Sequence, residues 1–141
     1  MNHLKHGALI LLFGAAIGCT RQPAHYPVQG RVTFDGKPAA NVDVQFHRTG
    51  PGLPHTAIPA KSDADGRYTV VSPGTKGILA GEYVVVFSKF AMPDGSPVAA
   101  DAKPGEVGAV QLLPERYQSV EARVHVVTVE KDLEVDFDLK R

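Results

Sequence analysis

The segment LEVDFDL at residues 133–139 alternates without exception between apolar and acidic side chains. Successive side chains of a β-strand point to opposite faces, so a strict period of two predicts a strand with one buried face. The same pattern occurs in VQGRVTF at residues 28–34 and in VDVQFH at residues 42–47. After residue 18, no ten-residue stretch combines helical periodicity with helix-forming composition. The chain is therefore predicted to be all-β.

Turn signals separate these segments from further predicted strands. Asp35-Gly36 and Asp65-Gly66 are tight-turn pairs, because glycine adopts a positive φ at no steric cost. Further strands are expected at residues 60–62, 67–71, 82–89 and 121–129, and loops rich in Pro and Gly at 48–59 and 91–110. The strand at 82–89 is apolar on both faces, which predicts a central place in its sheet. Six or seven strands with such turns predict an antiparallel sandwich of two sheets.

The N-terminal segment has the features of an export signal. Lys5 precedes an apolar run at residues 8–17, and a run of this length is too short to span the roughly 30 Å of hydrocarbon in a membrane. The sequence AIGC at residues 16–19 then resembles the lipobox of bacterial lipoproteins, in which the signal is cut before a cysteine that carries a diacylglycerol. Ala16 stands where leucine is usual. Cys19 is the single cysteine of the chain.

These features predict a signal peptide at residues 1–18, cleavage between Gly18 and Cys19, a lipidated tether at 19–27 and one domain at 28–141. The protein is then expected in the cell envelope, outside the cytoplasm, with Cys19 as its lipidation site and the membrane as its first partner. Whether the inner or the outer membrane holds the anchor stays open. The alternatives are an ordinary signal peptide with an unrelated cysteine, or a cut nearby after an alanine.

The charge balance argues against nucleic acid as a partner. The chain has 15 Lys and Arg residues against 15 Asp and Glu residues. Apart from the terminal Lys140-Arg141, it has no run of basic residues that could follow a phosphate backbone.

The acidic pair Asp63 and Asp65, followed by Gly66, invites comparison with a calcium-binding loop. The EF-hand loop needs acidic ligands at its first and last positions, where this chain has Lys61 and Ser72. We therefore interpret the segment as a hairpin turn, in which Asp63 accepts hydrogen bonds from main-chain amides and Gly66 adopts a positive φ.

The histidines are the other candidates for a site. His25, His47, His55 and His125 show none of the spacings typical of metal ligands. His47 and His125 fall on predicted strands, and only the fold could bring them together. No metal, no cofactor and no catalytic residue is predicted, and no GxSxG nucleophile motif is present.

Several segments together resemble a known family. VQGRVTFDGKPAANVDVQFH, SDADGRYTV, LAGEYVVVF, LPERY and DLEVDFDL look like the carboxypeptidase-regulatory-like, transthyretin-like domains, and the added lipobox is similar to small lipoproteins of planctomycete bacteria. The resemblance implies a seven-stranded, Greek-key, prealbumin-like β-sandwich, used as an accessory module. It also raises comparison with the 5-hydroxyisourate hydrolases of that fold, but their terminal Tyr-Arg-Gly-Ser is absent here.

The predicted function is that of a non-catalytic, membrane-anchored module with a structural or protein-interaction role. The alternative is a surface that binds carbohydrate or peptide. The absence of tryptophan and the small number of tyrosines argue against a stacking platform for sugars. The long loop at residues 91–110 is a candidate contact for envelope proteins or glycans, although its Pro, Ala and Gly content and its lack of aromatic residues fit a surface excursion without a partner better.

Overall fold

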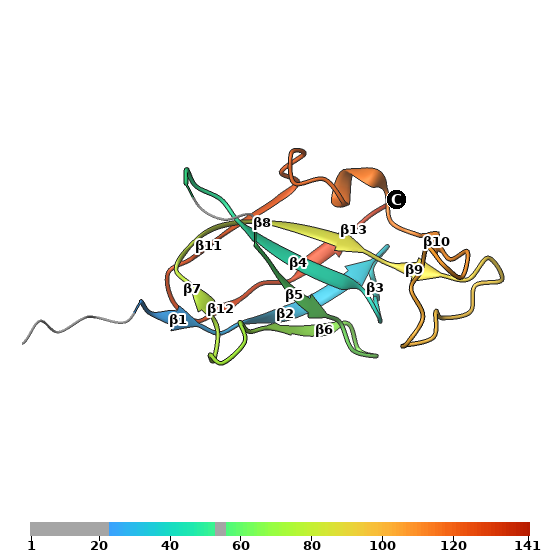
Figure 1. Ribbon diagram of the computed structural model, residues 1–141, viewed down its shortest axis with the longest axis horizontal. Helices are drawn as coiled ribbons and strands as arrows, with labels where there is room; N and C mark the ends of the chain where they lie inside the picture. Colours follow the sequence, from blue (N-terminus) through green and yellow to red (C-terminus); the bar gives the residue numbers. More distant parts are fainter. Residues whose placement is uncertain (1–22, 53–55) are drawn as a thin grey trace, which may run out of the picture.

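The computed structural model describes residues 23–52 and 56–141, and these form an almost entirely β-structure (Figure 1). The signal peptide, Gly18, Cys19 and His55 lie outside the described residues. The strands are β1 (His25–Tyr26), β2 (Val28–Phe34), β3 (Lys37–Pro38), β4 (Asp43–Arg48), β5 (Ala57–Lys61), β6 (Arg67–Val70), β7 (Ile78–Leu79), β8 (Gly81–Ser88), β9 (Phe90–Ala91), β10 (Val110–Gln111), β11 (His125–Val129), β12 (Leu133–Glu134) and β13 (Phe137–Leu139), with one 3-10 helix, η1 (Glu115–Tyr117).

The predicted all-β sandwich is confirmed. Each of the predicted strand segments overlaps at least one observed strand. The count of seven is not confirmed, because short paired strands such as β3, β7, β9 and β10 are added and because the last segment is divided into β12 and β13.

One sheet contains four antiparallel strands in the order β11-β8-β4-β5. β8 lies inside it, and both of its faces are buried. Tyr83, Val85 and Phe87 belong to the core, while Val84 and Val86 on the other face are only 0% and 7% exposed. The predicted central position of this strand is confirmed.

The other sheet has five strands arranged around β2. β6 and β3 pair with β2 in antiparallel orientation on one side, whereas β12 and β13 pair with it in parallel on the other. The expectation of a wholly antiparallel sandwich is therefore wrong at this edge. The expectation failed because a period of two identifies only which face of a strand is buried. The pattern is the same whether the strand runs parallel or antiparallel to its neighbour.

Aromatic side chains fill the space between the sheets. Phe137 from the C-terminal strand lies among them, with ring centroids 4.9 Å from Phe87, 5.9 Å from Tyr68 and 6.5 Å from Phe46. Its ring meets those of Phe87 and Phe46 edge to face, an arrangement that adds to the stabilisation from apolar burial.

Two strand boundaries expected from the sequence are wrong. β5 begins at Ala57, inside the predicted loop, and includes Pro59, which an edge strand tolerates because one side of it donates no ladder hydrogen bonds. Residues 121–124 precede β11 and do not belong to it. Leu113 and Tyr117 are buried, whereas Leu112 is 42% exposed.

The two ends of the molecule are distinct. β1 pairs with β7 at one end of the long axis, so the paired structure extends into the predicted tether (Figure 1). At the opposite end, β9 pairs with β10. The chain between these two strands forms the predicted long loop, and their pairing closes its base. Among the residues described, no helix has the length and hydrophobicity that crossing a membrane would require.

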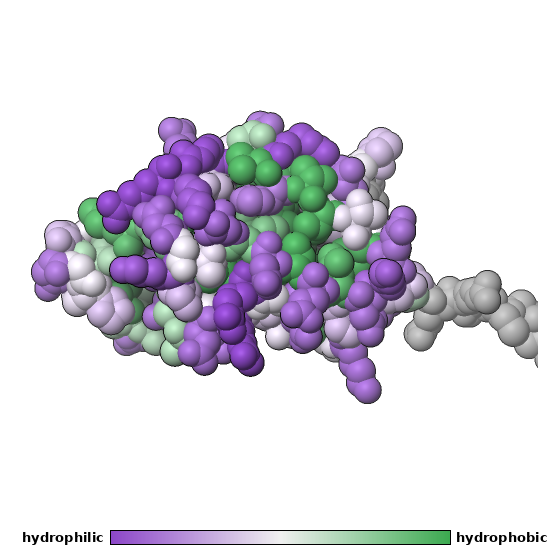
Figure 2. Space-filling model, turned by 180° about the vertical axis from the view of Figure 1, so that it is seen from behind, coloured by the Kyte–Doolittle hydropathy of each residue, from purple (hydrophilic) through white to green (hydrophobic). Residues whose placement is uncertain are grey.

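Most of the surface seen from behind is hydrophilic, with a band of apolar side chains on it (Figure 2). The exposed large apolar residues of the described chain are Val71, Val107, Val110, Leu112, Val124 and Val126. Folded proteins commonly expose some apolar surface of this kind.

Candidate functional site

The parallel ladder between β2 and the C-terminal segment is interrupted at Val135 and Asp136. The Val135 amide donates to the Gln29 carbonyl at 2.9 Å, so in a regular parallel ladder the Arg31 amide would donate to the Val135 carbonyl. Instead the Arg31 amide donates to the Asp136 carboxylate at 2.8 Å. The Val135 carbonyl accepts a 2.6 Å hydrogen bond from the Tyr68 hydroxyl. The side chain of Asp136 thus takes the place of a main-chain carbonyl in the sheet.

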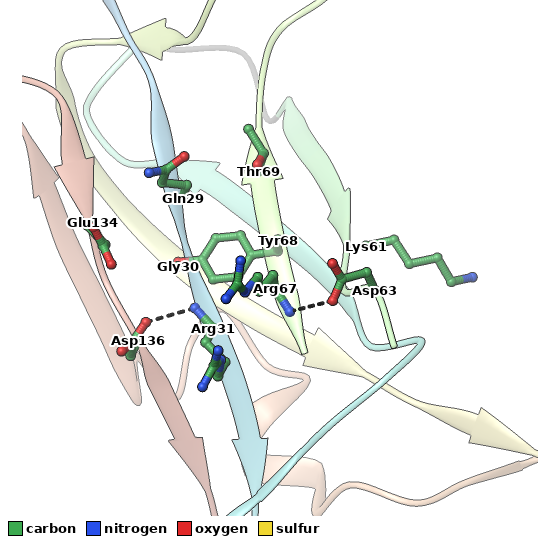
Figure 3. A pocket seen from close by; sticks show the side chains of 10 residues that line it. All are labelled: Gln29, Gly30, Arg31, Lys61, Asp63, Arg67, Tyr68, Thr69, Glu134 and Asp136. Carbon is green, nitrogen blue, oxygen red and sulfur yellow. Dashed lines mark hydrogen bonds between the residues drawn. The ribbon is translucent and has the colours of Figure 1, made fainter. Parts of the chain in front are cut away.

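Gly30 leaves the space for this exchange. A Cβ atom at Gly30 would lie 1.8 Å from the Val135 carbonyl oxygen. This separation is far shorter than a van der Waals contact, so only glycine fits at this position. Tyr68 is the cross-strand partner of Gly30, and its buried ring passes behind β2 toward Val135 (Figure 3). Burial, together with the negative charge of Asp136, raises the pKa of Tyr68 well above its ordinary value, so its hydroxyl remains a donor.

The outer face of this sheet carries a polar groove of about 860 Å³ (Figure 3). Exposed side chains of β2 and β6 form its floor, and the segment after β5 and the strands β12 and β13 stand on its two sides. The groove is lined by Gln29, Gly30, Arg31, Lys61, Asp63, Arg67, Tyr68, Thr69, Glu134 and Asp136. All of these except Gly30 and Tyr68 carry exposed polar side chains.

Two arginines face each other on the floor. Arg31 of β2 and Arg67 of β6 are direct cross-strand partners, so their side chains share the outer face. Within the described residues, neither guanidinium takes part in an ion pair or donates a hydrogen bond. The pair could not be found from the sequence, because it depends on the register between two strands that lie far apart in the chain.

The turn at one side of the groove agrees with its sequence interpretation. Asp63 Oδ1 accepts hydrogen bonds from the amides of Asp65 and Arg67, both at 2.9 Å. Gly66 has a φ of +76°, and its amide donates to the Asp63 carbonyl at 3.0 Å. The predicted turn is confirmed, but it is not a hairpin, because β5 pairs with β4 in one sheet and β6 pairs with β2 in the other.

The histidines do not converge. His47 lies on the outer face of β4, and His125 lies on the inner face of β11, where its ring stacks on Tyr117 and meets Phe87 and Phe137 edge to face. His25 is exposed on β1. In the part of the chain that the structure describes, no three metal-ligating side chains cluster.

Burial lowers the pKa of two groups near the strands, His125 and Lys89. Desolvation lowers the pKa of His125 below its ordinary value, and its Nε2 atom is buried without a hydrogen-bond partner among the described residues. Desolvation also lowers the pKa of Lys89, whose ammonium group donates to the Ala40 carbonyl.

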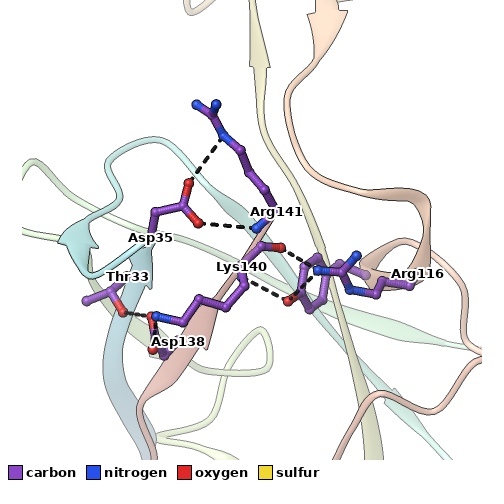
Figure 4. A network of polar contacts seen from close by, with 7 residues as sticks. Thr33, Asp35, Arg116, Asp138, Lys140 and Arg141 are labelled. Carbon is purple, nitrogen blue, oxygen red and sulfur yellow. Dashed lines mark hydrogen bonds and ion pairs between the residues drawn. The ribbon is translucent and has the colours of Figure 1, made fainter.

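The LPERY segment holds the end of the chain (Figure 4). The Arg116 guanidinium donates to the Lys140 carbonyl at 2.6 Å, and the Lys140 amide donates to the Tyr117 hydroxyl at 2.9 Å. Beyond it, the Arg141 side chain pairs with Asp35 at 3.2 Å. These contacts give LPERY a structural role in securing the last strand.

A second hollow of about 450 Å³ lies where the long loop meets the ends of β4 and β8. Its lining combines the charged side chains of Asp43, Lys61 and Lys89 with small apolar residues of the loop, among them Ala99, Ala100 and Ala102. Asp43 and Lys61 form an ion pair at 3.5 Å across it, so two of its charges already have partners.

No family model matches the sequence, and no curated protein matches it significantly. Among solved structures, similar chains include a DUF3823 family protein from Parabacteroides merdae, with 15% identity, a TM-score of 0.45, and coverage of 84% of this chain and 47% of that chain. A DUF3823 family protein from Bacteroides ovatus has 16% identity, a TM-score of 0.46, and coverage of 81% and 44%. An (S)-allantoin synthase has 17% identity, a TM-score of 0.47, and coverage of 84% and 41%. The chain spans less than half the length of each of these three proteins.

Proposed function

We propose that the protein is a lipid-anchored β-sandwich of the cell envelope that acts by binding a partner and not by catalysis. Cys19, placed directly after an apolar run and Gly18, supports the anchor. The resemblance to small planctomycete lipoproteins with a carboxypeptidase-regulatory-like domain supports the accessory role.

The observation that carries the proposal is the arrangement of the two ends. β1 begins at His25, a few residues after Cys19, and lies at one end of the long axis (Figure 1). The chain between β9 and β10 projects at the other end. A lipid at Cys19 would hold the first end near the membrane and direct the second end away from it, which suits a module that displays a surface.

The chemistry of the groove favours binding over catalysis. Asp63 and Asp136 each accept hydrogen bonds from main-chain amides through a carboxylate oxygen. The bonds to Asp63 stabilise the turn, and the bond to Asp136 stabilises the sheet. Two of the three carboxylate side chains that line the groove are therefore already engaged in structural hydrogen bonds. The remaining floor residues offer hydrogen bonds and positive charge, which are means of recognition.

The anchor is tested with Cys19→Ala. We expect metabolic labelling with an alkyne fatty acid to mark the wild-type protein and to fail in this variant. The variant should either disappear from the membrane fraction or retain its uncleaved signal peptide. Thr20→Ala, at the neighbouring position, should still be labelled. Full labelling of the Cys19→Ala protein would refute the anchor.

The binding role is tested by mild detergent extraction after cross-linking. We expect an envelope component to co-purify with the wild-type protein after extraction from cells that express it. A variant in which residues 98–107 are replaced by a short Gly-Ser link tests whether the distal loop makes that contact. Recovery of the same component from both proteins would assign the contact to another surface, and the absence of any component from either would speak against the binding role.

A further inference from the structure

We propose that the polar groove binds an acidic polysaccharide, with Arg31 and Arg67 holding the carboxylate of a uronic acid. This inference rests on the proposed binding role and names the class of ligand. Its starting point is the pair of opposed arginines on the groove floor.

The pair has an energetic cost in the free protein. Like charges directly opposite on neighbouring strands destabilise a sheet. Acidic side chains are close by, yet Arg31 and Arg67 form no ion pair with them in the described chain. Both guanidinium groups extend from the same face of the sheet, and a carboxylate bound between them would remove the repulsion and accept hydrogen bonds from both.

The neighbouring pair on the floor extends the site. Gln29 and Thr69 are cross-strand partners two positions along the same face. Their side chains make no hydrogen bond to another described residue. They offer both donors and acceptors, which suits the hydroxyl groups of a sugar next to the one that carries the carboxylate.

Acidic side chains at the sides of the groove disfavour a ligand with closely spaced negative charges. Asp63 stands on one side, and Glu134 and Asp136 stand on the other. These negative charges repel a ligand with closely spaced phosphates, such as a nucleic acid, more than a chain whose single carboxylates are separated by neutral hydroxyl groups.

The lining also distinguishes a polysaccharide from a peptide. Peptide grooves take apolar side chains into pockets, whereas every side chain that faces this groove from its floor and sides is polar. The one aromatic residue of the lining, Tyr68, directs its ring behind β2 into the core. Recognition here therefore depends on hydrogen bonds and charge, without sugar stacking.

The test compares two hexasaccharides of the same linkage, one of galacturonic acid and one of neutral galactose, by titration calorimetry with the full chain. We expect the acidic hexamer to bind and the neutral one to bind at least about tenfold more weakly, since a hydrogen bond to a charged group contributes enough for such a factor. Arg31→Gln and Arg67→Gln should each weaken the acidic hexamer by about tenfold, and added salt should weaken it further.

The control is Lys76→Gln, which makes the same charge change outside the groove and should leave the affinity unchanged. The melting temperatures of both arginine variants should stay equal to that of the wild type or rise, because the variants lose a repulsion. Equal binding of the two hexamers, or wild-type affinity in both arginine variants, would overturn the proposal. Tighter binding of single-stranded DNA or of a phosphopeptide than of the acidic hexamer would also overturn it.

This result is independent of the anchor. The titration does not require acylation of Cys19, so a failure of acyl labelling leaves it interpretable. Normal labelling and a captured envelope component, together with no binding of the acidic hexamer, would refute the groove ligand and leave the proposed function standing.

Discussion

The Tyr68 hydroxyl donates a 2.6 Å hydrogen bond to the Val135 carbonyl across β2, and it thereby ties β6 to the C-terminal segment on the far side of the central strand. The Val135 carbonyl has left the ladder to accept this bond, and no other donor reaches it among the described hydrogen bonds. The bond therefore links β6 to the residues between β12 and β13, on opposite sides of β2.

Tyr68→Phe should lower the free energy of unfolding by about 1–3 kcal/mol, because the partly buried Val135 carbonyl loses its donor while the ring stays in place. Urea denaturation followed by circular dichroism measures this. Tyr26→Phe is the matched control, since the Tyr26 hydroxyl has no hydrogen-bond partner in the described part of the chain, and it should change stability little. Equal effects of the two substitutions would contradict the assigned role.

Gly30→Ala should destabilise the protein more strongly, by about 3 kcal/mol or more, because its methyl group would collide with the Val135 carbonyl and push the last strand from β2. Gly105→Ala is the control, since no atom lies within 4 Å of the Cβ it would add. The melting temperature of each variant gives the comparison. A Gly30→Ala protein as stable as the wild type would show that the strand can shift at no cost.

Protonation of His125 should make the protein less stable in mild acid. Burial lowers the pKa of His125, so in the window between that lowered pKa and about 6.5 the unfolded chain binds the proton and the folded chain does not. Stability should then fall as the pH drops from above 6.5 through this window. His125→Phe should flatten this part of the pH profile of the melting temperature.

His47 supplies the comparison for this pH dependence. Desolvation also lowers the pKa of His47, but the charge of Glu121 opposes this shift, so His47→Gln should flatten the profile less than His125→Phe. If His125→Phe left the slope unchanged, the acid sensitivity would belong to other groups.

Arg116→Gln should loosen the C-terminal strand. The variant loses the 2.6 Å hydrogen bond to the Lys140 carbonyl, and we expect a loss of about 1 kcal/mol. Hydrogen exchange should rise at residues 137–139 and remain unchanged in β4. Glu115→Gln is a suitable control because the neighbouring side chain makes no ion pair in the described chain. Unchanged exchange at residues 137–139 would mean that Phe137 and Leu139 hold the strand without this contact.

Much of the architecture was accessible from periodicity. The alternation at residues 28–34 and 133–139 identified both buried faces, and Asp63 and Gly66 were placed correctly in their turn. The direction of the last strand was not accessible, because alternation carries no information on orientation. Pro59 obscured β5, since an edge strand tolerates a residue that a central strand excludes.

The groove was less predictable than the fold. Arg31 and Arg67 each looked like an ordinary solvent-facing residue of a strand, and only the pairing of β2 with β6 reveals that they oppose each other. The role of Gly30 was hidden for the same reason, because the carbonyl that occupies its side-chain space comes from a segment 105 residues further along the chain.

The pairing of β2 with the last strands also bears on when the protein can fold. Contacts between residues so distant in sequence give a fold a high contact order and slow its formation, because a long loop must close first. For a chain that is exported from its N-terminus, β2 would reach the far side of the membrane long before its parallel partner. The central sheet would then stay incomplete until β13 had emerged, so the finished fold would form only after that strand had crossed.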